Sequence, residues 1–222
     1  MLTFANMDHS TIINNTIQFV KDTLKNAEGG HDWWHIHRVH TNAKLIAPAE
    51  KADLLTVELA ALLHDIADSK FNNGDEDIGP ATAGRYLSSI GIAPATVLHV
   101  QNIIRYMSFK AGFDNPAFHS AELAVVQDAD RLDAIGAIGI ARAFSYGGFK
   151  GRELYNPGIK PDLNMSKDAY KSSTAPTINH FYEKLLLLKD KMNTETGKRL
   201  AEQRHQFMEA YLEQFYVECG LS

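Results

Sequence analysis

Apolar residues recur at helical spacing along nearly the whole chain. The spacing predicts helices over 10–26, 31–47, 51–68, 80–90, 94–107, 121–144, 177–192 and 194–218. Ser10 is placed to cap the first helix and Asp32 to cap the second. No segment shows the convincing alternation of a half-buried β-strand. The pattern therefore predicts an all-α protein built as a helical bundle.

One long segment departs from this pattern. Residues 145–173 are dense in Gly, Pro, Lys and Asp and show no period. Loops of this length in a compact domain are usually functional or disordered, so an active-site lid and a mobile insertion both remain open. The helices on either side belong to one bundle pattern. We therefore expect a single domain over residues 1–222, with a core of about 10–217.

Composition restricts the class of protein and its partners. Of the 222 residues, 45% are hydrophobic and 22% charged, an ordinary globular balance, and the formal net charge is -5. This charge argues against nucleic acid or an anionic membrane as the main partner. Cys219 is the single cysteine, so no disulfide framework exists. With no signal-peptide pattern and no membrane-length apolar run, we expect a soluble cytoplasmic protein; the oligomeric state, a homodimer included, stays open.

A carboxylate interrupts the most apolar predicted helix. The stretch ELAALLHDIADSK, residues 58–70, carries His64 and Asp65 amid residues suited to a core. An unpaired buried charge costs several kcal/mol, so Asp65 requires a strong partner or a metal ion. The alternative is that His64 is a hydrogen-bonded core histidine and that His64 and Asp65 have no catalytic or metal-binding function.

Two other segments offer further metal ligands. His35 falls in the first turn of its helix, and VVQDADRLDA supplies Asp128, Asp130 and Asp133, which could also simply cap or solvate a helix. Two imidazoles and two carboxylates would suit Mn, Fe, Co or Ni, or Zn with fewer ligands, whereas Mg prefers more oxygen. Spacing alone does not choose among the three aspartates.

Taken together, these motifs resemble the HD superfamily of metal-dependent phosphohydrolases. The matching motifs are HIHRV at 35–39, LLHDIAD at 62–68 and DADRLD at 128–133. Residues 125–142 and INHFYEKLLLLKDKMNTETGK resemble the bacterial branch that includes nucleotide pyrophosphohydrolases, and the resemblance spans about residues 12–217. It implies a bundle of the HD-domain type and four metal ligands: His35, His64, Asp65 and Asp130.

The resemblance also bears on the metal. We expect one divalent ion per chain, with Mn favoured over Mg, Ni, Co or Fe. Members with two metals add histidines after the HD pair, whereas this chain has Asn102 and Met107 in that region. This departure favours a mononuclear site, with His99 and His119 kept as further candidate ligands.

Charged residues near these motifs are candidates for the reaction itself. Arg38 lies one turn after His35, and Lys184 lies four residues after His180, so we expect Arg38, Lys184 and His180 to bind substrate. Asp68 is expected to move a proton or orient His64, and Lys70 to hold phosphate charge. The alternative for each cation is a solvated surface position, and for Asp68 a helix cap.

The resemblance implies a small phosphorylated substrate. Nucleoside or deoxynucleoside triphosphates, cleaved to monophosphate and pyrophosphate, are favoured. The alternatives are hydrolysis of another phosphate ester or diester, such as a nucleoside monophosphate or a cyclic or guanosine polyphosphate nucleotide, a non-haem iron oxygenase, and a non-catalytic nucleotide-binding or metal-sensing module. Tyr146, Phe149 and Tyr155 in the long loop are candidates for stacking on a base, with packing or exposure as the alternative.

Overall fold

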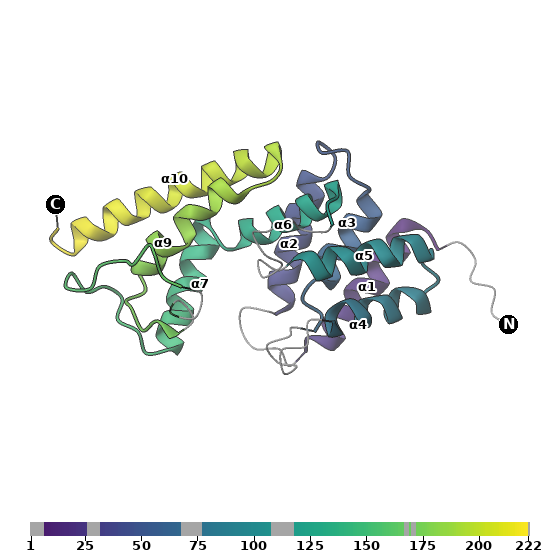
Figure 1. Cartoon of the computed structure of the whole chain (residues 1–222), viewed down its shortest axis with the longest axis horizontal. Coiled ribbons are helices and arrows are strands. Elements are labelled where there is room, and N and C mark those ends of the chain that lie inside the picture. The colour runs from purple at the N-terminus through teal and green to yellow at the C-terminus, as the bar shows by residue number, and fades with distance from the viewer. Residues whose placement is uncertain are drawn as a thin grey trace. The chain divides into compact units, whose positions relative to one another are not determined.

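The computed structural model describes residues 7–25, 32–67, 77–107, 118–166, 169 and 172–221. Within these ranges the chain forms helices and loops and no β-strand (Figure 1), which confirms the all-α prediction. None of the helices in the described ranges combines the length and the apolar composition needed to cross a bilayer. Contacts group the chain into two compact units, residues 1–130 and 131–222. The single domain over 1–222 stays a prediction.

The first unit is built around α3 (Leu54–Leu63). This helix packs against α1 (His9–Thr23), α2 (Trp33–Ile46) and α5 (Pro94–Met107), and α5 packs in turn against α4 (Ile78–Ser89). Residues 59–63 of α3 have no exposed surface at all. Burial of this helix on every side explains why its sequence lacks a polar face.

Aspartates cap the N-termini of α1, α2 and α3. Asp32 caps α2, as predicted, but Asp8 rather than Ser10 caps α1, its Oδ1 accepting a hydrogen bond from Thr11 N at 2.7 Å. The Ser10 hydroxyl also donates to Asp8 Oδ1. Asp53 caps α3 in the same way. An aspartate at each of these positions satisfies a backbone N–H that the first turn leaves unpaired.

The predicted single helix over 121–144 is wrong. This part of the chain instead forms two helices, α6 (Ala121–Asp133) and α7 (Gly136–Phe149). α6 crosses the boundary between the units. Gly136 has a φ of +72°, a left-handed conformation that glycine adopts without strain. A Cβ on Gly139 would lie 2.2 Å from the Ala134 carbonyl oxygen. These two glycines permit the break between the helices.

The second unit contains α7 and the C-terminal helices. α10 (Glu195–Glu218) packs against α7 and against the 3₁₀ helix η3 (Leu185–Lys191), and η3 packs against α9 (Asn179–Glu183). The predicted helix over 177–192 is therefore wrong, because Lys184, with φ -146° and ψ -57°, separates α9 from η3. The long loop begins after Phe149, so residues 145–149 belong to α7. Its role as a lid stays a prediction.

Candidate metal centre

The start of α2 positions His35. Asp32 is the N-cap, and its Oδ1 accepts a hydrogen bond from His35 N at 2.9 Å. Ile36 and Val39 on the same helix are fully buried, and the His35 side chain is 3% exposed. A capped helix end and a packed face thus fix the backbone from which the imidazole extends.

His64 and Asp65 follow the last residue of α3. The prediction that they lie within a helix over 51–68 is wrong, because α3 ends at Leu63 and residues 64–67 form a turn. His64 Nδ1 lies 2.8 Å from the Ala61 carbonyl oxygen, which can only accept, so we assign the ring proton to Nδ1. His64 Nε2 then carries a lone pair, which is the form in which a neutral imidazole binds a metal.

Asp130 extends from α6. The buried residues Val126 and Ala129 pack this helix into the first unit, and Asn42 Nδ2 on α2 donates to the Ala129 carbonyl oxygen at 3.2 Å. Asp130 Oδ1 lies 3.5 Å from His35 Nε2 and 4.0 Å from His64 Nε2. The Asp130 side chain is 42% exposed, so this side of the cluster is open to solvent.

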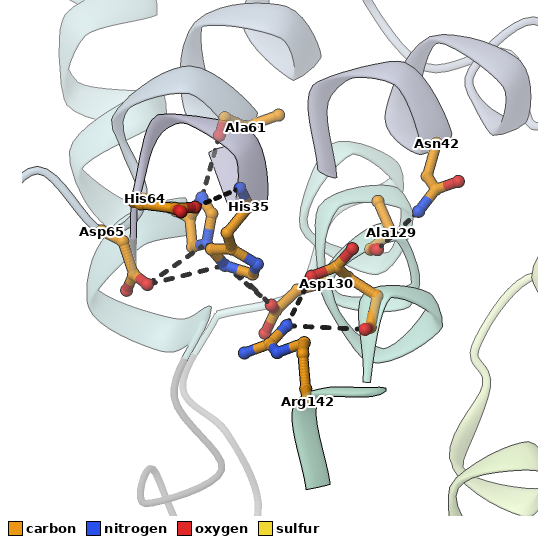
Figure 2. Close-up of polar contacts among 10 residues, drawn as sticks. His35, Asn42, Ala61, His64, Asp65, Ala129, Asp130 and Arg142 are labelled. Atoms are coloured by element: carbon orange, nitrogen blue, oxygen red, sulfur yellow. Dashed lines mark hydrogen bonds and ion pairs between the residues drawn. The ribbon is translucent and has the colours of Figure 1, made fainter. Parts of the chain in front are cut away.

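The four side chains converge on His35 Nε2. In Figure 2 they point toward one another from the start of α2, the end of α3 and α6. His35 Nε2 lies 3.3 Å from His64 Nε2, 3.6 Å from Asp65 Oδ2 and 3.5 Å from Asp130 Oδ1. Ligand atoms of His35, His64 and Asp130 all lie within 4.8 Å of one another. All four residues belong to the first unit.

The separations among His35, His64 and Asp130 fit the ligands of one divalent ion, and Asp65 lies close to both histidines but outside the group of atoms that are all within 4.8 Å of one another. Metal–ligand bonds of about 2.0–2.2 Å put adjacent ligands roughly 3 Å apart and opposite ligands roughly 4 Å apart. With its proton on Nδ1, His64 Nε2 is an acceptor, and the oxygens of Asp65 and Asp130 lie 3.8 and 4.0 Å from it. A cation would satisfy this group of acceptors, and the nitrogen and oxygen donor set suits Mn, Fe, Co, Ni or Zn.

The structure separates the three aspartates of DADRLD. Asp128 is fully buried, and the buried Asp133 accepts a hydrogen bond through Oδ2 from Arg142 Nη1. Asp130 is the one of the three whose carboxylate lies beside His35. This arrangement agrees with the aspartate that the family resemblance selects. Metal binding by His35, His64, Asp65 and Asp130 itself stays a prediction.

The other candidates in the first unit have different positions. Arg38 is half-buried on α2, one turn after His35. His99 Nε2 lies 3.1 Å from Ser120 Oγ and 3.4 Å from Glu122 Oε2, and His119 is exposed. The predicted catalytic residues Asp68 and Lys70 lie outside the described residues.

His180 and Lys184 belong to the second unit, in α9 and directly after it. Burial, together with the nearby charges of Lys184 and Arg152, lowers the pKa of His180 from 6.5 to about 4. His180 is therefore a neutral imidazole in a positive environment at neutral pH. A negatively charged group would be favoured beside it.

Arg152 was missed by the sequence analysis. Its Nη2 donates to the Ser173 carbonyl oxygen at 2.5 Å, and its guanidinium lies 5.5 Å from the centre of the Tyr146 ring. Arg152 precedes His180 by 28 positions, so no helical spacing links the two residues. The available signal was an arginine in a Gly-rich loop, which is too common to single out.

Known proteins identify the family. A family model for the HD domain matches residues 33–135. A crystal structure of an HD-superfamily hydrolase from Bacillus thuringiensis aligns with a TM-score of 0.78 and 42% identity, covering 97% of this chain and 100% of that chain. The chain belongs to the HD superfamily of hydrolases.

Relatives of known structure extend this HD-superfamily assignment over almost the whole chain. YpgQ of Bacillus subtilis (strain 168) is 40% identical over 200 residues, which cover 88% of each protein. A crystal structure of YpgQ in complex with ADP aligns with a TM-score of 0.76 and 38% identity, covering 96% of this chain and 97% of that chain. As an HD-superfamily hydrolase, the protein offers a His/Asp cluster suited to a divalent metal.

Proposed function

We propose that this protein hydrolyses nucleoside or deoxynucleoside triphosphates to the monophosphate and pyrophosphate, in a reaction that requires one divalent cation. The proposed ligands are His35, His64, Asp65 and Asp130, and the proposed metal is Mn²⁺. The observation that carries the proposal is the approach of three donor atoms to within 3.6 Å of His35 Nε2.

A nucleotide substrate is supported by two independent features. The relative YpgQ has been crystallised in complex with ADP, a nucleoside polyphosphate. In this chain, His180 lies near Lys184 and Arg152, whose charges would favour a phosphate group.

The charges of the site explain why further cations are needed. Two carboxylates nearly cancel the charge of a dication, so the centre alone would hold a polyphosphate weakly. Arg38 and Lys184 keep their proposed role of supplying the remaining charge, and His180 its proposed role in binding the substrate. When bound, the metal supplies charge for the phosphate oxygens and lowers the pKa of a water nucleophile. Asp68 and Lys70 keep their proposed roles in proton transfer and charge stabilisation.

A substrate screen tests this function. The purified protein is incubated with ATP, dATP, GTP, AMP and a cyclic nucleotide, each with Mn²⁺, Mg²⁺, Co²⁺ or Ni²⁺, and phosphate and pyrophosphate are measured separately. We expect a triphosphate to give pyrophosphate and monophosphate in equal amounts. Release of phosphate alone would replace the proposed reaction with a phosphatase reaction. Turnover that survives chelation and Asp65→Ala would exclude the proposed centre.

A further inference from the structure

A cleft of about 310 Å³ lies within the second unit. It is formed by residues 155–161, by residues of α9 and by the C-terminal part of α10, and three tyrosines, Tyr155, Tyr182 and Tyr216, line it. Its volume falls at the lower end of the range for small-molecule sites. None of its lining residues belongs to the candidate metal centre.

Two of these tyrosines form a corner. The rings of Tyr155 and Tyr216 lie 5.5 Å apart at 75°, and Phe215 packs edge-on against both of them. The Tyr182 and Tyr216 side chains are joined by a hydrogen bond. Perpendicular rings present one face and one edge to the same space, an arrangement that a flat aromatic ligand complements. These contacts hold the aromatic wall in place before any ligand arrives.

Asn179 adds a hydrogen-bond acceptor to the cleft lining. This residue is 1% exposed, and its Nδ2 donates to the Ile159 carbonyl oxygen at 3.1 Å. That bond fixes the orientation of the amide, and Oδ1 has no partner within the described part of the chain. This oxygen is not among the fully buried atoms that lack a partner, so it can accept a hydrogen bond from a ligand N–H in the cleft.

We propose that this tyrosine cleft binds a nucleoside whose base carries an exocyclic amino group. The base lies against the rings of Tyr155 and Tyr216, and its amino group donates to Asn179 Oδ1. Stacking on tyrosine tolerates any base, so the amide oxygen is the element that selects the amino group. Pro157 and Pro161, which also line the cleft, restrict the loop that forms one wall.

Binding of adenosine to the full-length parent protein tests the proposal. Adenosine carries no phosphate and is not a substrate of the proposed hydrolysis, so failure of that function leaves this test intact. Affinity is measured by calorimetry and by ligand-observed NMR. Tyr216→Ala is expected to weaken adenosine binding at least about tenfold, the scale of a lost base–aromatic stack.

The matched control is Phe207→Ala. Phe207 is an exposed aromatic residue on the same helix α10 and does not line the cleft, so affinity should be unchanged. Purine riboside, which lacks the 6-amino group, should bind about fivefold to tenfold more weakly than adenosine. If Tyr216→Ala does not fold, Ile159→Trp replaces it, because Ile159 is 44% exposed and a larger side chain there would fill the cleft.

Two results would overturn the tyrosine cleft as a nucleoside site. The first is the absence of saturable adenosine binding to the parent protein. The second is binding that Tyr216→Ala and Ile159→Trp both leave at the parental affinity. Equal affinity for adenosine and purine riboside would remove the role given to Asn179.

Discussion

His35 and His64 face each other through their Nε2 atoms at 3.3 Å, although 29 positions separate them in the chain. With the His64 ring proton assigned to Nδ1, where it bonds to the Ala61 carbonyl oxygen, a proton on His35 Nε2 or a cation would stabilise the approach of the two nitrogens. Carboxylate oxygens of Asp65 and Asp130 lie 3.6 and 3.5 Å from His35 Nε2. This concentration of negative charge favours a dication over a single proton.

Replacing Asp65 should separate metal binding from folding. Because Asp65 lies in a turn after α3 and its side chain is 22% exposed, Asp65→Ala leaves no apolar cavity. We expect bound metal to fall below one per chain and turnover to drop by about 100-fold or more, while the helical circular dichroism spectrum persists. Metal content is measured by elemental analysis after dialysis.

Asp22→Ala is the control for Asp65→Ala. Asp22 is an exposed aspartate on α1 that bonds to Gln18, and its removal should change neither metal content nor turnover. An Asp65→Ala protein with parental turnover would contradict the assignment of the centre.

Substitutions of the neighbouring aspartates Asp130 and Asp133 should have opposite effects on metal binding and on the free energy of unfolding. Asp130→Asn is expected to abolish metal binding with little change in the free energy of unfolding, because the side chain is partly exposed. Asp133 is buried and pairs with Arg142. Asp133→Asn removes its negative charge and should lower the free energy of unfolding by about 2–4 kcal/mol. Urea unfolding and metal analysis of both variants check this. Equal metal loss in both would show that Asp130 has no special role.

The sequence predicted the helical class because it depends on a period that repeats along the chain. Local rules also placed the Asp32 cap, which needs no information from outside its own turn. Local rules failed where the structure depends on a contact between residues distant in sequence or on an unusual backbone angle. The break after α6 depends on the positive φ of Gly136, and glycine at helical spacing carries no sign of that angle.

The candidate centre was predictable in kind but not in detail. A charged pair in an apolar helix indicated a metal or partner, yet spacing could not choose among Asp128, Asp130 and Asp133. That choice came from the family resemblance, and the structure supplies a physical reason in the Asp133–Arg142 pair. Arg152 was missed because it meets His180 through tertiary structure alone.

Glu58 should make the first unit sensitive to acid. Its buried carboxylate accepts hydrogen bonds from His9 Nε2 at 2.5 Å and His40 Nε2 at 2.9 Å. Burial alone would raise the pKa of Glu58, but these hydrogen bonds and the nearby charge of Lys44 outweigh it and hold the pKa below 4.5. A folded-state pKa below the unfolded value gives stability that is present above pH 4.5 and is lost as the pH falls through the folded value.

Glu58→Gln tests this contribution. At pH 7 the variant should lose about 1–3 kcal/mol of unfolding free energy, since at least one histidine loses its acceptor. The difference from the parent should shrink below pH 4.5. Urea unfolding is measured across this range, and Glu213→Gln, an exposed change on α10, should match the parent throughout.

Lys184 should act on substrate affinity rather than on the metal. Lys184→Ala is expected to raise the KM for a triphosphate about tenfold, with unchanged metal content, because one charge-assisted contact is lost. Lys189→Ala is the control, since Lys189 instead pairs with Glu202 at 3.4 Å. Steady-state kinetics with saturating Mn²⁺ compare the two variants. Identical KM values for the two variants would show that Lys184 does not bind the substrate.

The buried imidazole of His180 should make the second unit lose stability on mild acidification. Its pKa is about 4 in the folded chain and 6.5 when unfolded, so the unfolded chain binds the proton more readily and stability falls as the pH drops below 6.5. This shift limits the effect to about 3 kcal/mol, of which about 2 kcal/mol is lost by pH 5. Unfolding in urea at pH 7.5 and pH 5, with a chelator present, measures the loss. His180→Gln cannot take up this proton, so its loss between the two pH values should be smaller by about 2 kcal/mol. An equal loss in both proteins would mean that His180 is already protonated in the folded chain at pH 5, against the cationic environment that Lys184 and Arg152 create.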